Sequence, residues 1–264
     1  MAKLNVFIDG SWLFKVCAPG HVLAARTEND NQGVVLDFAR LDMILLDHAT
    51  AHDPDCTELG ERYLCTSVFT LPPDFDGWPD QYDGIRAEHV EQAKRNIYAR
   101  NRFVKSATDA GYSDRGVYRP PIKPWILEKL IDKSKKYQEK LVDTTIVALL
   151  VRAAITAPGD DHCIITGDAD LLPAVRLAHA EYSRNVFLAT THPDELKAEH
   201  RQSSYSLHNF DFRIPPVYLQ DNVLEIVQGE YVSECYQCRR VFSRPYPPAI
   251  PSRPYCSACG ARRS

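Results

Sequence analysis

Short apolar runs alternate with longer amphipathic segments along most of the chain. The runs that we interpret as strands are residues 3–8, 61–70, 116–119, 161–166 and 185–190. Between them, apolar positions recur at helical spacing. The segments that we interpret as helices are residues 36–46, 85–110, 125–155 (with an interruption near Lys140), 171–182 and a last one that begins at Pro193. Strands that alternate with helices predict an α/β fold with a mostly parallel central sheet of about five strands flanked by helices.

The remaining segments set the expected domain boundaries. A loop through Gly20 and Gly33 follows the first strand, and residues 71–84, rich in Pro, Asp and aromatic residues, are expected to form a loop near the mouth of a site. Around Pro215-Pro216 the pattern breaks, and Tyr218–Val227 is a mixed apolar run that could pack back on the core. We therefore expect a main domain over 1–212, a connector over 213–231 and a small module over 232–264.

Length and composition limit the class of protein. A chain of 264 residues, 44% of them hydrophobic, can hold one ordinary domain and a small appendage. No stretch approaches the roughly 20 apolar residues of a membrane span, and Met1–Asn5 lacks the layout of a signal peptide. We therefore expect a soluble cytoplasmic protein with no membrane partner.

Charge is strongly segregated along the chain. Residues 1–83 hold 14 acids and 5 bases, residues 94–140 hold 13 bases and 5 acids, and residues 141–234 hold 14 acids and 6 bases. The last 30 residues hold six arginines and no acid. Either these charges only solvate the surface, or the basic segments hold a polyanion beside the acidic ones.

Aspartates stand where the expected strands end. Asp9 closes the run Val6-Phe7-Ile8, Asp168 and Asp170 follow the strand at 161–166, and Asp143 opens an otherwise apolar helix. Residues just past the carboxyl ends of parallel strands line the ligand crevice of such a fold. Each aspartate alone has an ordinary explanation as a turn residue or helix cap. Together they predict a site for a hard divalent cation, because clustered carboxylates repel one another without one.

These residues resemble a known family. Val6-Phe7-Ile8-Asp9-Gly10, Lys140-Leu141-Val142-Asp143 and Ile165-Thr166-Gly167-Asp168-Ala169-Asp170-Leu171-Leu172-Pro173 are similar to motifs of NYN domains, in the PIN-like nuclease superfamily. The resemblance covers about residues 3–212. It implies a PIN-like sheet that binds Mg²⁺ or Mn²⁺ and cuts phosphodiester bonds, usually of RNA. The family's acidic positions match Asp9, Asp143, Asp168 and Asp170, which are therefore the expected metal ligands and catalytic residues.

Three further residues are expected to contact substrate. Ser11 and Thr166 lie beside the aspartates as hydroxyl candidates, and Lys140 would neutralise a phosphate oxygen. An exposed helix lysine without such a role is an equally good reading of Lys140. The chemistry implied is hydrolysis by a metal-activated water, with a second metal or the same one stabilising the departing 3′ oxygen.

Four cysteines near the end of the chain form a second motif. Cys235, Cys238, Cys256 and Cys259 give two C-x₂-C pairs separated by 17 residues, a spacing typical of a tetrahedral structural Zn²⁺ site. Chance pairs or disulfides are the alternative. Gly260, just after the last cysteine, suits a turn that needs a positive φ. With so small a core, such a module would draw most of its folding energy from the metal.

The arginines and aromatic residues of this module can be interpreted in two ways. Arginines that include Arg239 and Arg240 alternate with Tyr236, Phe242, Tyr246 and Tyr255. Either they contact phosphates and unpaired bases, or the aromatics form the small core and the arginines keep it soluble. A docking surface for a protein partner, or a contact between copies of this chain, remains a further possibility.

The leading hypothesis is a metal-dependent ribonuclease whose zinc ribbon helps to hold RNA, with DNA as the other possible substrate. The alternative is an NYN-like module that binds RNA or a protein with little or no cleavage, because Ala148-Leu149-Leu150 carries no acid two turns after Asp143. A Toprim-like fold would place Glu rather than Asp9 on the first strand. A phosphatase of the haloacid dehalogenase type would need an aspartate where Ser11 stands.

Overall fold

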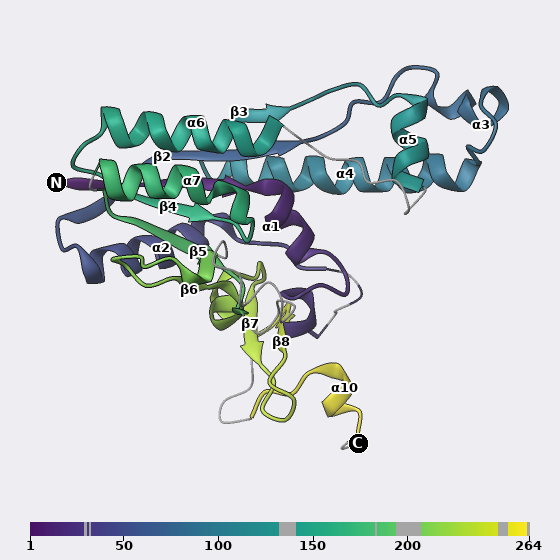
Figure 1. The fold of residues 1–264 in the computed structure, drawn as a ribbon. Coiled ribbons are helices and arrows are strands. Elements are labelled where there is room, and N and C mark those ends of the chain that lie inside the picture. The colour runs from purple at the N-terminus through teal and green to yellow at the C-terminus, as the bar shows by residue number, and fades with distance from the viewer. Residues whose placement is uncertain are drawn as a thin grey trace.

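The computed structural model describes residues 1–28, 31, 33–131, 141–182, 184–193, 207–247 and 253–262. They form an α/β domain and a small hairpin near the C-terminus (Figure 1). Lys140, the helix interruption expected beside it and the helix expected after Pro193 lie outside these residues. Within them, no helix has both the length and the apolar character that crossing a membrane requires.

The central sheet is parallel throughout the described chain. Its strands are β1 (Ala2–Asp9), β2 (Cys56–Ser67), β3 (Ser113–Tyr118), β4 (Asp161–Ile165), β5 (Val186–Thr190) and β6 (Val217–Tyr218). They are ordered β3-β2-β1-β4-β5-β6, and every neighbouring pair is parallel. The α/β class predicted from the alternating pattern is therefore confirmed. The sixth strand is the two-residue β6 at the sheet edge, inside the segment expected to be a connector.

Helices cover both faces of this sheet. The helices of the described chain are α1 (Gly10–Cys17), α2 (Phe38–His52), α3 (Trp78–Gln81), α4 (Ala87–Asp109), α5 (Pro124–Ile131), α6 (Leu141–Thr156), α7 (Leu172–Arg176), α9 (Val223–Ile226) and α10 (Ser257–Gly260). Of these, α3, α5 and α10 lie away from the sheet (Figure 1). Side chains of β1 alternate between the faces: Val6 and Ile8 pack in one core cluster with α1, α2 and α4, and Phe7 packs in another with α6 and α7. Both faces of the central strands are therefore buried, each by one of these clusters.

Two segments differ from the loops that the sequence predicts. Residues 10–17 form α1 directly after β1, and residues 71–84 contain a 3₁₀ turn (Phe75–Gly77) followed by α3. The expected helix at 171–182 is α7 followed by a π-helical turn at Leu177–Glu181. The Tyr218–Val227 run does pack back on the core, since Leu219, Val223 and Ile226 are buried in the cluster beside α2.

An arm extends from the β3 side of the sheet. The far part of α4 runs past the ends of the strands and carries α3 and α5 with it (Figure 1). These elements share a small apolar core of their own, which includes Phe75, Trp78, Val90 and Ile126. The arm is thus a packed extension of the fold.

The C-terminal hairpin docks on the opposite part of the domain. Its strands β7 (Tyr231–Glu234) and β8 (Val241–Arg244) are antiparallel. Val241 bridges to Thr27, and its carbonyl accepts the backbone N–H of Glu28 at 2.7 Å. The Glu28 carboxylate also pairs with Arg244 at 3.4 Å and accepts the backbone N–H of Ser257.

Candidate active site and cysteine cluster

Asp9 lies at the junction of β1 and α1, at the carboxyl edge of the sheet. Its side chain caps α1: Oδ1 accepts the backbone N–H of Trp12 at 3.0 Å. Oδ2 accepts the hydroxyl of Thr166, at the end of β4, at 2.9 Å. Only 4% of the residue is exposed. These two hydrogen bonds fix the plane of the Asp9 carboxylate. The sequence alone predicts only that Asp9 lies at the end of a strand.

Three aspartates share one electrostatic environment. Burial raises the pKa of Asp9 from 3.8 to about 6, although the bonds from Trp12 and Thr166 oppose this effect. The negative charges of Asp143 and Asp168 make smaller contributions to the same rise. Their influence means that the first turn of α6 and the end of β4 bring these carboxylates close to Asp9.

Asp168 and Asp170 stand on the turn after β4. Asp168 caps the 3₁₀ turn Ala169–Leu171, where its Oδ1 accepts the backbone N–H of Asp170 at 3.0 Å. Its own backbone N–H donates to Thr166 Oγ1 at 3.0 Å. Asp170 is exposed. Capping is therefore one role of Asp9 and of Asp168.

The aspartate oxygens are not gathered tightly around one position. In the part of the chain that the structure describes, the one group of three or more possible ligand residues whose donor atoms all lie within 4.8 Å of one another is the cysteine quartet. The aspartates are spaced more widely. Of the hydroxyl candidates, Thr166 contacts Asp9 directly, whereas Ser11 Oγ lies 3.2 Å from Thr66 Oγ1 at the end of β2.

Trp12 borders the same crevice, and the sequence pattern does not single it out. Its backbone N–H holds Asp9, while its indole packs so closely on Gly167 that a methyl group there would collide with the ring. Gly167 lies between Thr166 and Asp168. The indole therefore covers the turn that carries Asp168, and the glycine at 167 is the sequence signal for this close approach.

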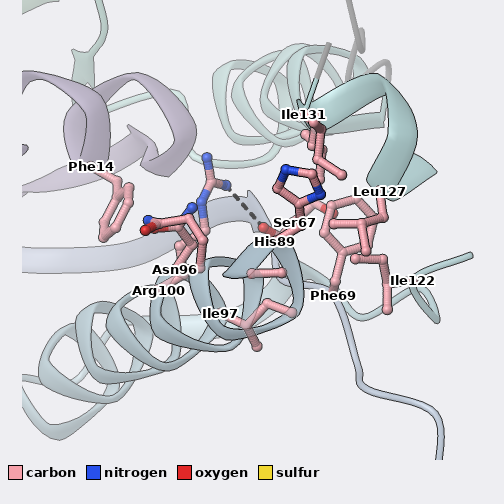
Figure 2. A pocket seen from close by; sticks show the side chains of 13 residues that line it. Phe14, Ser67, Phe69, His89, Asn96, Ile97, Arg100, Ile122, Leu127 and Ile131 are labelled. Atoms are coloured by element: carbon pink, nitrogen blue, oxygen red, sulfur yellow. Dashed lines mark hydrogen bonds between the residues drawn. The ribbon is translucent and has the colours of Figure 1, made fainter. Parts of the chain in front are cut away.

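A cavity of about 550 Å³ opens next to the crevice (Figure 2). Side chains from α1, α4 and α5 and from the end of β2 surround it. Arg100 crosses its inner end: Nη1 donates to the carbonyl of Ser67 at 3.0 Å, and the guanidinium lies 5.1 Å from the ring centroid of Phe14. The amphipathic pattern of residues 85–110 predicts α4 but not this cavity, because its other walls come from distant parts of the chain.

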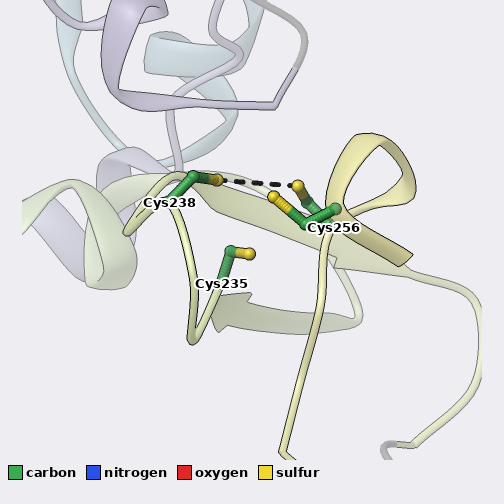
Figure 3. A group of neighbouring side chains, drawn as sticks. Cys235, Cys238 and Cys256 are labelled. Atoms are coloured by element: carbon green, nitrogen blue, oxygen red, sulfur yellow. Dashed lines mark hydrogen bonds between the residues drawn. The ribbon is translucent and has the colours of Figure 1, made fainter. Parts of the chain in front are cut away.

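The four cysteines of the C-x₂-C pairs come together at the hairpin. Their sulfur atoms all lie within 4.8 Å of one another, and those of Cys238 and Cys256 are 3.6 Å apart (Figure 3). Tetrahedral zinc with Zn–S bonds of about 2.3 Å implies sulfur–sulfur distances of about 3.8 Å. The cluster therefore has the composition and the size of a structural Zn²⁺ site.

Backbone turns aim these thiols at one another. Arg239 N donates to Cys235 O at 2.9 Å, and Gly260 N donates to Cys256 O at 2.8 Å. Burial acts to raise the pKa of Cys235, but backbone N–H groups of Cys238, Cys256 and Gln237 lower it overall to about 6, whereas burial raises the pKa of Cys256 and, to about 12, that of Cys259. Cys235 is thus the thiol of this cluster that most favours the thiolate that metals bind. The positive φ expected at Gly260 occurs instead at Arg239, with φ of 62°.

Arginines and aromatic side chains of the hairpin do pair. The Arg253 guanidinium lies 4.2 Å from the ring centroid of Tyr236, and that of Arg244 lies 4.7 Å from Phe242. Arg239 forms an ion pair with Glu234 at 2.6 Å, and Arg240 is exposed. Phe242 is buried among the cysteines, whereas Tyr236 and Tyr246 remain exposed. The aromatics therefore divide between the small core and the surface.

Comparison with known proteins identifies no relative of known function. No family model matches the chain, and no curated protein does. Among solved structures, a crystal structure of a protein of unknown function from Vibrio parahaemolyticus matches 86% of this chain and 96% of its own, at 11% identity and a TM-score of 0.42. A match at that score carries no argument about fold or activity.

Proposed function

We propose that the protein is a metal-dependent ribonuclease of the NYN type. One observation carries the proposal: Asp9 is buried at the carboxyl edge of a parallel sheet, where burial raises its pKa to about 6 and the charges of Asp143 and Asp168 add to the rise. Gathering like charges around a desolvated carboxylate is unfavourable in the isolated protein. A divalent cation would convert this repulsion into attraction and return Asp9 to its ionised form.

The donor set suits Mg²⁺ or Mn²⁺, which prefer carboxylate oxygens. Asp9, Asp143 and Asp168 would hold the ion, and Asp170, exposed beside them, would orient a water. When bound, such an ion supplies an activated water and compensates charge on the phosphate. The chain contributes the positioning: Thr166 and Trp12 hold the plane of Asp9, and the Trp12 indole packs against Gly167 in the turn that carries Asp168.

Arginines of α4 and of the ribbon support a polyanionic substrate. Arg95, Arg100 and Arg102 lie along α4, and the zinc ribbon contributes Arg240 and Arg253. Arm and ribbon project from opposite parts of the sheet domain (Figure 1). Electrostatic attraction from both would hold a phosphate backbone across the aspartates, and we expect RNA to be preferred over DNA.

The test is cleavage of end-labelled single-stranded RNA and DNA by the purified protein with Mn²⁺, with Mg²⁺ and with EDTA. Cutting should require a divalent ion and fall at least a hundredfold in Asp168→Asn. Asp55→Asn is the matched control, because Asp55 is an exposed aspartate at the opposite edge of the sheet, before β2. Cutting that persists in EDTA, or that Asp168→Asn leaves intact, would refute the proposed mechanism.

A second candidate is an NYN-like module that binds RNA without cutting it. The wide spacing of the aspartate oxygens favours this candidate, together with the absence of an acid at Ala148-Leu149-Leu150. It predicts that wild type and Asp168→Asn bind single-stranded RNA equally and that neither cleaves it with either metal. The same assay therefore separates the two functions.

A further inference from the structure

The cavity and the aspartate site share two elements, α1 and the end of β2. Phe14, on its wall, lies one helical turn after Ser11, and Ser67, at its inner end, follows Thr66. Ser11 and Thr66 are joined through their hydroxyls at 3.2 Å. An occupant of the cavity would therefore lie next to any substrate held at Asp9.

The walls of the cavity are apolar and partly aromatic. Phe14 and Phe69 line it together with the buried side chains of Ile97, Ile122 and Leu127. Its volume of about 550 Å³ falls within the range of about 300–1,000 Å³ found for small-molecule sites. So large an apolar hollow at a polar crevice suits a flat, uncharged group.

Polar groups at the cavity carry donors, acceptors and one positive charge. Gln92 and Asn96 are exposed on α4: Gln92 Nε2 donates to Asn96 Oδ1 at 3.0 Å and Gln92 Oε1 accepts from Arg95, which leaves the Asn96 amide nitrogen as a donor toward a ligand. Arg100 adds a guanidinium group, whose Nη1 donates a hydrogen bond to the carbonyl of Ser67. A ligand that combines an apolar ring, hydrogen-bonding edges and an anionic link matches this lining.

We propose that the cavity binds one unpaired nucleoside of the RNA strand, with its base against Phe14 or Phe69 and the adjoining phosphate near Arg100. A base within a duplex could not enter, so this site would select single-stranded segments beside the cleaved bond. Stacking of one base on an aromatic side chain is worth about 1–3 kcal/mol. The inference rests on RNA as the substrate, but not on cleavage of it.

The experiment fills the cavity with a larger side chain. Ala93 lines the cavity on α4 and is 8% exposed, so Ala93→Trp would occupy the space of the base. Ala99→Trp is the matched control, because Ala99 is exposed on the same helix and does not line the cavity. Binding of a fluorescein-labelled single-stranded RNA is measured by anisotropy in EDTA, so that cleavage cannot contribute.

Ala93→Trp should weaken binding of the single strand at least tenfold and abolish its preference over a hairpin RNA. Ala99→Trp should change binding less than twofold. Equal affinities of the two variants, with equal thermal midpoints, would overturn the nucleoside site. Because Asp168→Asn tests cleavage and Ala93→Trp tests binding, failure of the proposed function and failure of this inference give different results.

A measurement on the wild-type chain covers the case in which Ala93→Trp does not fold. RNA that carries 5-iodouridine is irradiated in the complex, and the crosslinked peptides are identified by mass spectrometry. Crosslinks at Phe14 or Phe69 support the site. Crosslinks confined to the ribbon, at Tyr236 or Tyr246, would overturn it and assign base contact to the hairpin.

Discussion

His162 lies in the middle of the sheet with no exposed surface, next to the amide of Asn5, whose Nδ2 is 3.4 Å from Nδ1 of the imidazole. Burial lowers the pKa of His162 from 6.5 to about 4. The unfolded chain therefore takes up a proton near pH 6.5, whereas the folded protein does so only near pH 4. The stability that this histidine contributes is complete above pH 6.5 and is lost as the pH falls toward 4.

We predict that His162→Leu removes this part of the pH dependence. Between pH 7.5 and 4.5 the free energy of unfolding of the wild type should fall by roughly 2.5 kcal/mol more than that of the variant. Urea unfolding at the two pH values measures the difference. His52→Leu, at an exposed histidine at the end of α2, is the control and should follow the wild type. Parallel curves for wild type and His162→Leu would contradict the prediction.

At the scale of single residues, the sequence predicts where a residue lies in the fold better than it predicts what its side chain does there. The strand ends at Asp9 and Asp168 follow from local apolar runs. The capping of α1 by Asp9 does not, because residues 10–17 open with a glycine, a weak helix former. Gly10 is needed for another reason: a Cβ there would lie 2.8 Å from Leu64 Cδ1 and 3.0 Å from the carbonyl of Cys65. This tight packing of α1 on β2 is a tertiary requirement that no local pattern reveals.

At the scale of elements, a buried polar network ties α2 to β2 and to the segment after α4. Asp42 on α2 is 2% exposed and forms an ion pair with Arg62 of β2 at 2.6 Å. It also accepts the hydroxyl of Tyr112, and Arg62 donates to the carbonyl of Ala110 at 2.9 Å. Burial raises the pKa of Asp42 in spite of the bonds from Tyr112 and Arg62, so its charge depends on these partners.

We predict that Asp42→Asn lowers the free energy of unfolding by about 3 kcal/mol. The amide leaves Arg62 without its counter-charge in a largely enclosed position, and removing one partner of a buried pair is strongly destabilising. Asp109→Asn breaks an exposed i,i+4 pair with Lys105 and should cost less than about 0.5 kcal/mol. Chemical unfolding of both variants at pH 7.5 tests this, and equal losses would contradict the role given to Asp42.

The elements that the sequence does not predict are those fixed by distant contacts. β6 has only Val217 and Tyr218, directly after Pro216, and it is a strand because β5 offers a free edge. Within residues 71–84, Phe75 and Trp78 are buried against α4, so a segment with loop composition becomes part of the arm. The long helix α4 is predicted from its own helical periodicity, and β4 is predicted from its short apolar run.

At the scale of the whole molecule, one carboxylate connects the C-terminal cysteine module, here called the ribbon, to the sheet domain. The Glu28 side chain is 12% exposed, and its two oxygens contact Arg244 in β8 and the backbone N–H of Ser257 at the start of α10. These contacts join both halves of the C-x₂-C module to a loop that follows α1. The cysteine spacing predicts the module, but it contains no information on where the module docks.

We predict that Glu28→Ala releases the ribbon from the sheet domain without unfolding either. The bridge from Thr27 to Val241 would be the main remaining link, so amides of β7 and β8 should exchange with deuterium at least tenfold faster, whereas those of β1 and β4 should not change. Zinc content should stay at one ion per chain, because all four thiols belong to the ribbon itself.

Glu234→Ala is the matched control: it removes the exposed pair with Arg239 inside the ribbon and leaves the Glu28 contacts intact. If docking also positions the ribbon arginines for RNA, Glu28→Ala should weaken RNA binding several-fold more than Glu234→Ala. Unchanged exchange in Glu28→Ala would mean that the bridge and the apolar contacts beside it hold the ribbon without this carboxylate.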